Sequence, residues 1–237
     1  MYNYTMKSRQ RVQLPANVEV IRSNRKSFSL EVKLDGSLLV RAPKRASDVD
    51  IQAILTQKAP WIEGTQAKIK RKFPDYQPKK FKPGEKFWYL GHQYPLKLTD
   101  RQRPSLMLDG SFLLAHPAKD RAREVFIAWY REQTRQITAD LIQQYTTAYS
   151  FDVNQVRITS ARTRWGSCSG KNNLNFTYRL SMAPLPVIDY VVVHELVHLK
   201  VRNHSPAFWN ALAAIMPDYK EKRDWLKRHA ALLSLDL

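Results

Sequence analysis

Residues 191–199 read Val-Val-Val-His-Glu-Leu-Val-His-Leu, and this stretch decides how the chain is interpreted. An α-helix turns about 100° per residue, so His194 and His198, four positions apart, share one face. Their imidazoles can therefore reach a single zinc ion. Glu195 projects beside the metal, where it can take a proton from a water molecule. The remaining positions are apolar, which predicts a buried helix that carries a metal site.

A third candidate ligand, His204, follows shortly after this stretch. Asn203 can adopt a left-handed conformation, and Ser205-Pro206 is typical of the cap and first position of a new helix. A turn at Asn203 would return His204 to the metal, and three protein ligands leave one position for water, as in catalytic zinc sites. Each ligand needs a partner for its second ring nitrogen. The acidic candidates are Asp189, Asp218 and Asp224. The alternative is a helix with two hydrogen-bonded core histidines and no metal.

Together with Phe208-Trp209, the spacing of these histidines resembles that of zincin metallopeptidases related to the SprT and WLM groups, and in particular the bacterial YgjP-like metal-dependent hydrolases. Residues 164–169 (Arg-Trp-Gly-Ser-Cys-Ser) and 188–196 are similar to other signatures of that family. The resemblance is strongest over about residues 155–230 and looser over 15–115. Metzincins share the histidine spacing, but Val201 stands where they carry glycine, and no methionine turn is recognisable.

This resemblance implies a zincin-like fold, a Zn²⁺ cofactor and hydrolysis of a peptide bond. It also implies a strand beside the metal helix that pairs with extended substrate, for which residues 173–180 are our candidate. Phe208 and Trp209 are expected to pack against His204 and hold it in place. Arg164 and Arg179 are candidates for stabilising developing negative charge or holding an anionic substrate group. The alternative is that these two arginines are surface or structural residues.

Composition and terminal sequence bear on the compartment. Hydrophobic residues make up 43% of the chain, which is typical of a globular protein. No apolar run approaches the ~20 residues of a membrane span, and residues 1–4 do not resemble the start of a secretion signal. Cys168 is the only cysteine, so no intramolecular disulfide can form. These features predict a cytoplasmic protein without a membrane partner.

The charge is strongly positive, at +18 over 237 residues. Residues 1–116 hold 22 Lys and Arg against 10 Asp and Glu, whereas residues 117–237 hold 17 against 11. Such an excess favours polyanionic partners, although it can equally serve solubility. Residues 68–86 place eight basic side chains around three aromatics, which suggests weak nucleic-acid binding. A solvated linker with three prolines is the favoured alternative, because no nucleic-acid-binding module is recognisable.

The N-terminal half has the alternation and turn residues of short strands. A first strand is expected at residues 18–22, and Ser47 is expected to cap a helix that Pro60 separates from a second one. Three hairpins are predicted from their turn signals. They cover residues 28–41 around Asp35-Gly36, 87–98 around Gly91-His92, and 105–114 around Asp109-Gly110.

The C-terminal half has mainly helical periodicity. A long helix is expected over residues 120–149, strands over 155–159 and 173–180, and helices beginning near Ser205-Pro206 and Pro217. The sequence therefore predicts an α+β fold. A β-rich, basic N-terminal region of hairpins, residues 1–116, would precede a zincin-like helical metallopeptidase domain with a small sheet, residues 117–237.

Three functions compete. The leading hypothesis is zinc-dependent hydrolysis of a peptide bond in an unidentified peptide or protein, with Glu195 as general base. The second is hydrolysis of a phosphoanhydride such as that of a nucleoside triphosphate, because the same activated water serves either reaction. The third is a nucleic-acid-associated binding protein in which the metal only stabilises the fold.

Overall fold

The three predicted hairpins all form, and they fall into two different parts of the chain. The computed structural model describes residues 13–74, 76–100, 102–230 and 232. Contacts between Cα atoms divide the chain into two units, Met1–Pro78 and Lys79–Leu237.

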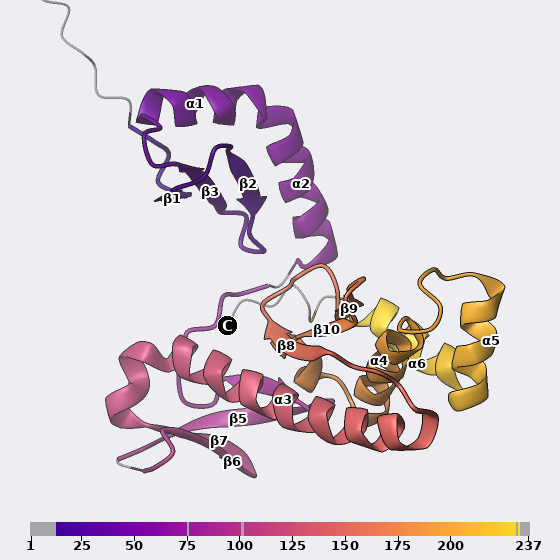
Figure 1. Cartoon of the computed structure of the whole chain (residues 1–237). Helices are drawn as coiled ribbons and strands as arrows, with labels where there is room; N and C mark the ends of the chain where they lie inside the picture. The colour runs from indigo at the N-terminus through magenta and orange to yellow at the C-terminus, as the bar shows by residue number, and fades with distance from the viewer. Residues whose placement is uncertain (1–12, 75, 101, 231, 233–237) are drawn as a thin grey trace, which may run out of the picture. The chain divides into compact units, whose positions relative to one another are not determined.

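The first unit is a three-stranded sheet with two helices packed against it (Figure 1). Its elements are β1 (Val18–Ser23), β2 (Ser29–Val32), β3 (Leu38–Pro43), α1 (Asp48–Gln57) and α2 (Ala59–Lys72). The sheet order is β1-β3-β2, with β1 parallel and β2 antiparallel to the central strand. Apolar residues of β3 and the inner helix faces form the core, including Val40, Ile51 and Ile62.

The predicted cap of α1 is present. The backbone N–H of Asp50 donates to the Ser47 hydroxyl, and the Asp50 carboxylate accepts from the Ser47 backbone N–H. This reciprocal pair satisfies two backbone donors that would otherwise lack a partner at the helix start. Pro60 lies in the first turn of α2, where its missing N–H costs nothing, so it begins the second helix as expected.

The second unit opens with a four-stranded sheet, in the order β4-β5-β7-β6. Its strands are β4 (Lys86–Tyr89), β5 (His92–Thr99), β6 (Leu106–Asp109) and β7 (Ser111–Ala115). The hairpin of β4 and β5 turns at Leu90 and Gly91, one residue earlier than the predicted turn at Gly91-His92. Both turn residues have positive φ. A short 3₁₀ segment, His116–Arg121, then leads into the long helix α3 (Ala122–Tyr149).

The boundary between the two units differs from the predicted division at residues 116 and 117. The four-stranded sheet packs on α3 through aromatic contacts, among them Phe87 and Phe126, whose ring centroids lie 4.3 Å apart. Phe112 contacts the same cluster, 5.1 Å from Phe126. Residues 86–115 therefore belong with the C-terminal helices, because their apolar face is buried against α3.

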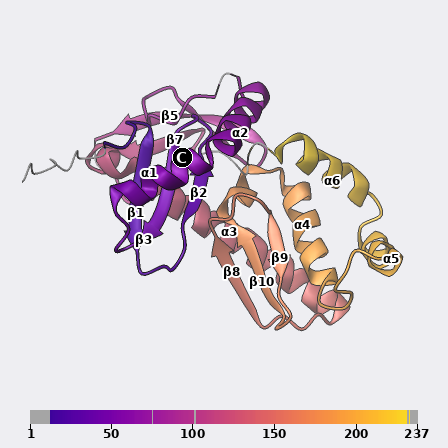
Figure 2. The ribbon, with the colours of Figure 1, turned by 90° about the horizontal axis from the view of Figure 1, so that it is seen from above.

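A second, smaller sheet of the same unit lies next to the helix that carries His194. Its strands are β8 (Gln155–Thr159), β9 (Gly166–Cys168) and β10 (Asn173–Thr177), followed by a 3₁₀ segment (Tyr178–Met182) and the helices α4 (Leu185–Val197), α5 (Pro206–Ile215) and α6 (Tyr219–Arg228). The order is β8-β10-β9, and Figure 2 shows α4 next to β9.

The fold class is α+β, as predicted, with helices and small mixed sheets in both units. Among the helices of the described residues, none combines the length and apolar character needed to cross a lipid bilayer.

Candidate metal centre and active site

The two histidines of the opening stretch lie at the C-terminal end of α4. Pro186 lies in the first turn of this helix, and the apolar run that follows is buried along most of its length. His194 occupies the last turn, and His198 is the C-cap residue. Their ring centroids are 4.9 Å apart, so the four-residue spacing does place both imidazoles together.

His204 joins this pair as predicted from its position in the sequence. Its Nε2 lies 3.0 Å from Nε2 of His194, and one ring nitrogen from each of the three histidines lies within 4.8 Å of the others. Ligand nitrogens of a tetrahedral zinc ion are about 3.3 Å apart, given Zn–N bonds of about 2.0–2.1 Å. The donor set therefore fits one zinc-sized ion.

The chain returns to the site without the expected left-handed residue. Asn203 is not among the described residues with positive φ. A turn follows α4, in which the Val201 N–H donates to Val197 O, and the Asn203 carboxamide oxygen accepts from the Ser205 N–H. The prediction of a left-handed turn at Asn203 was wrong, because hydrogen bonds on both sides of it reverse the chain.

Neighbouring groups hold the histidine rings in place. Nδ1 of His198 lies 3.0 Å from Val201 O, which leaves its Nε2 for the metal. The Phe208 ring is fully buried, and its centroid lies 4.4–4.9 Å from those of all three histidines. Trp209 Nε1 donates to His204 O and its ring stacks on the His204 imidazole. These contacts confirm that Phe208 and Trp209 are packing residues around the site.

The three acidic candidates for the second ring nitrogens have other partners. Asp218 pairs with Lys222, and Asp224 pairs with Lys227. Asp189 bonds Tyr145, and burial raises the pKa of its carboxyl. Among the described residues, none of these three candidates is seen to bond a histidine ring nitrogen. The group nearest Nδ1 of His194 is instead the Tyr190 hydroxyl, at 3.5 Å.

The electrostatics favour uncharged imidazoles. Burial, with His198 and His204 adding to it, lowers the pKa of His194 to about 3. Burial also lowers the pKa of His198, although the bond to Val201 O opposes the shift. Neutral imidazole is the form that binds a metal ion. These two donors are therefore ready for a cation at neutral pH.

Glu195 follows His194 directly in the chain and is almost entirely buried, at 5% exposure. Burial raises the pKa of its carboxyl to about 8, and the positive charge of Arg164 opposes that rise. Gly166, at the start of β9, approaches it so closely that an added Cβ would lie 2.6 Å from Glu195 Oε1. Sequence reasoning did not single out Gly166, although the glycine within the 164–169 signature was the available signal.

Arg164 and Arg179 have different environments. Arg164 is exposed and lines a pocket of about 260 Å³ with Asn175 and Thr177. Its positive charge lowers the pKa of the Glu195 carboxyl, so Arg164 is close enough to influence the site electrostatically. Arg179 is only 2% exposed; its guanidinium stacks 4.4 Å from the Tyr178 ring centroid and donates to Ser160 O. We therefore assign Arg179 a structural role instead of the predicted contact with substrate.

The strand expected to pair with substrate is not available for that purpose. β10 is the middle strand of its sheet, and its main chain pairs with β8 on one side and β9 on the other. The free edge beside α4 belongs to β9, which contributes Gly166 to the site. The prediction for residues 173–180 was wrong, because it could not include the order of the strands.

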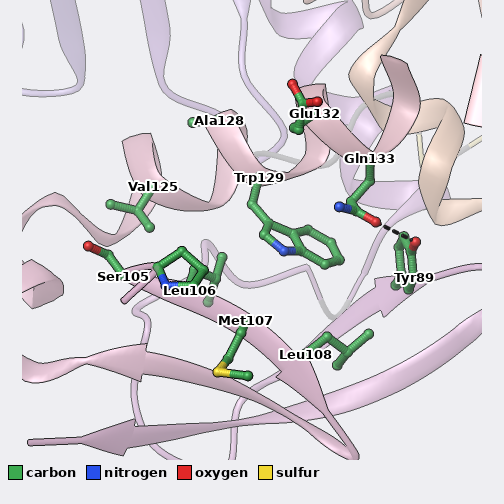
Figure 3. A pocket seen from close by; sticks show the side chains of 11 residues that line it. Tyr89, Ser105, Leu106, Met107, Leu108, Val125, Ala128, Trp129, Glu132 and Gln133 are labelled. Atoms are coloured by element: carbon green, nitrogen blue, oxygen red, sulfur yellow. Dashed lines mark hydrogen bonds between the residues drawn. The ribbon is translucent and has the colours of Figure 1, made fainter. Parts of the chain in front are cut away.

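A larger pocket of about 680 Å³ lies elsewhere in the second unit, between β6 and α3. Figure 3 shows Val125 and Trp129 of α3 facing Leu106 and Leu108 of β6, with a hydrogen bond between Tyr89 and Gln133 at one end. None of the three histidines lines this pocket, so it is separate from the candidate metal centre despite its larger volume.

Comparison with known proteins agrees with this geometry. The family described as YgjP-like, metallopeptidase domain, matches residues 26–229. The chain belongs to this family. As a YgjP-like protein it is a metal-dependent hydrolase of the metallopeptidase class.

Other comparisons add little. No curated protein matches significantly. A solved structure that matches is the crystal structure of the metallopeptidase zymogen of Pyrococcus abyssi abylysin, at 22% identity and a TM-score of 0.36, covering 39% of this chain and 93% of that one.

Proposed function

We propose that this chain is a zinc peptidase in which His194, His198 and His204 hold the ion and Glu195 acts as general base. The observation that carries the proposal is the convergence of three imidazoles beside one buried carboxyl. A zinc ion held there would polarise the scissile carbonyl and lower the pKa of a water molecule to near 7.

Glu195 supplies the proton transfers. It accepts a proton from the attacking water and then donates it to the amine nitrogen that leaves. Burial raises the proton affinity of its carboxyl, and a general base works best when its pKa lies near the working pH. The close approach of Gly166 limits the positions that this side chain can take. Arg164, on the exposed side, adds a positive charge that favours the ionised carboxylate.

The substrate would bind as an extended strand along the free edge of β9. An edge strand presents unpaired main-chain N–H and C=O groups, which can hydrogen-bond an added strand whatever its side chains are. Because β9 begins at Gly166, such a strand would pass next to Glu195. This placement supports peptide as the substrate, since a nucleotide offers no equivalent main chain.

The test compares wild type with Glu195→Gln, which keeps the shape and polarity of the side chain but cannot accept a proton. We expect the variant to keep its zinc, measured by elemental analysis, and to lose casein hydrolysis by on the order of 10²-fold or more. His204→Ala serves as the metal arm and should weaken zinc binding about 10-fold or more. Unchanged hydrolysis by Glu195→Gln, or full zinc occupancy in His204→Ala, would contradict these roles.

The same assay separates the competing functions. Turnover of nucleoside triphosphates in place of casein would favour phosphoanhydride hydrolysis. Unfolding after chelation, with neither substrate ever turned over, would favour a structural metal. Residence in the cytoplasm stays a prediction.

A further inference from the structure

The basic, aromatic segment at residues 68–86 is divided between the two units. Its second half packs into the second unit. The Phe81 ring stacks 5.5 Å from that of Phe87, and the Lys79 ammonium donates to Lys86 O while lying 5.0 Å from the Phe87 ring centroid. Phe81 and Lys79 therefore take part in folding contacts of the second unit and are less available to bases and phosphates than freely exposed side chains.

The first unit has its own positive excess, with 15 Lys and Arg against 7 Asp and Glu over residues 1–78. Three cations beside its sheet form ion pairs. These pairs are Arg22–Asp48, Lys33–Glu19 and Arg41–Glu31. On α2, by contrast, Lys68 and Arg71 are exposed and form no ion pair with any described residue. Among the exposed cations of the described residues of this unit, Lys26, Lys44 and Arg45 lie in turns between elements, whereas Lys68, Lys70 and Arg71 lie on α2.

The outer face of α2 carries an aromatic residue in line with these cations. Ile62 is buried against the sheet, and the Gln66 amide donates to Gly36 O, so the opposite face is directed outward. At 100° per residue, that face aligns Trp61, Gly64, Lys68 and Arg71. Trp61 is 49% exposed, and an added Cβ on Gly64 would meet nothing within 4 Å. These four residues, here called the α2 stripe, extend over about 15 Å of helix.

We propose that the α2 stripe binds single-stranded nucleic acid. Stacking of a base on an aromatic ring and neutralisation of phosphates by Lys and Arg are the two interactions that such binding needs. The exposed indole provides the first, and Lys68 and Arg71 provide the second. Gly64, about one helical turn along the stripe from Trp61, leaves open space, because an added Cβ there would meet nothing within 4 Å. This inference is independent of the peptidase proposal.

Other anionic partners fit less well. A helix that lies in a membrane interface buries a broad apolar face, whereas the α2 stripe has one large apolar side chain, Trp61. An acidic peptide would use the two cations but would give the indole no flat π-system to stack on. The contribution of Trp61 therefore distinguishes a nucleic acid from an acidic peptide.

The experiment measures binding of the full-length protein to a fluorescent oligothymidylate of about 15 nucleotides. Fluorescence anisotropy is followed between about 50 and 200 mM salt. Lys68→Gln/Arg71→Gln should weaken binding and reduce the slope of log affinity against log salt by up to about 1.4, since each phosphate contact on a single strand contributes about 0.7. Trp61→Ala should weaken binding by roughly 5-fold or more without changing the slope, and Trp61→Phe should restore most of it.

The matched control is Lys44→Gln/Arg45→Gln, which removes the same charge from exposed positions of the same unit outside the stripe. It should bind like wild type. Equal weakening by this control would reduce the effect to net charge and overturn the proposal. So would wild type that fails to bind at the lowest salt, or Trp61→Ala that binds as tightly as wild type. Trp61-dependent binding to phosphatidylserine vesicles without oligonucleotide binding would assign the stripe to a membrane instead.

Discussion

Gly166→Ala tests whether the approach of β9 to Glu195 is required for catalysis. The new Cβ would lie 2.6 Å from Oε1, 2.8 Å from Cγ and 3.0 Å from Cδ of Glu195. Ordinary van der Waals contacts begin at 3.4 Å, so the nearest atom must move by close to an ångström. Glu195 as a whole is only 5% exposed, so its side chain has little free space to move into. Gly166 does not have positive φ, so alanine is compatible with its backbone conformation.

This geometry leads to definite magnitudes. Overpacking of a buried site costs about 1–3 kcal/mol of folding free energy. A displacement of about 1 Å in a catalytic group costs on the order of 10²-fold in rate. The three heavy atoms nearest to the new Cβ all belong to the Glu195 side chain, so we expect the three histidines to keep their positions. We therefore expect Gly166→Ala to retain zinc, to lose about 10²-fold in hydrolysis and to unfold at lower urea concentration.

Gly170→Ala is the matched control. It makes the same substitution four residues later, at an exposed turn position without positive φ, where an added Cβ meets nothing within 4 Å. It should keep both activity and stability. The assays are casein turnover, elemental analysis for zinc and urea unfolding. Full activity in Gly166→Ala would refute the argument that this glycine positions the base, and equal losses in both variants would trace the effect to the loop as a whole.

Three further predictions concern Glu195 and the two arginines. In chelator-treated protein the folded Glu195 carboxyl stays protonated up to about pH 8, whereas an unfolded chain loses this proton near 4.5. The free energy of unfolding of wild type, measured with urea, should therefore fall by about 1.4 kcal/mol more than that of Glu195→Gln between about pH 7 and 9. An identical pH dependence of the two proteins would contradict this. Arg164→Gln should move the ascending limb of the pH–rate profile to higher pH, because Arg164 lowers the pKa of Glu195. Arg179→Gln should instead cost about 1–3 kcal/mol of stability and leave that limb in place.

Local sequence was sufficient to predict the elements that depend on neighbouring residues. The four-residue spacing of His194 and His198 follows from helix geometry and needs no tertiary information. The Ser47 cap and the Asp35-Gly36 hairpin likewise depend on side chains and φ values within a few residues. His204 lies close enough along the chain that only a short turn was needed to place it.

Tertiary structure decided what depends on residues far apart in the chain. The order β8-β10-β9 makes β9 the free edge, although the hydrophobic pattern of each strand is the same in any order. Packing on α3 assigns residues 86–115 to the second unit, and burial beside Tyr178 makes Arg179 structural. Gly166 lies next to Glu195 only after β9 docks on α4. Sequence periodicity specifies which face of an element is apolar, but the partner that covers this face is chosen by packing of the whole chain.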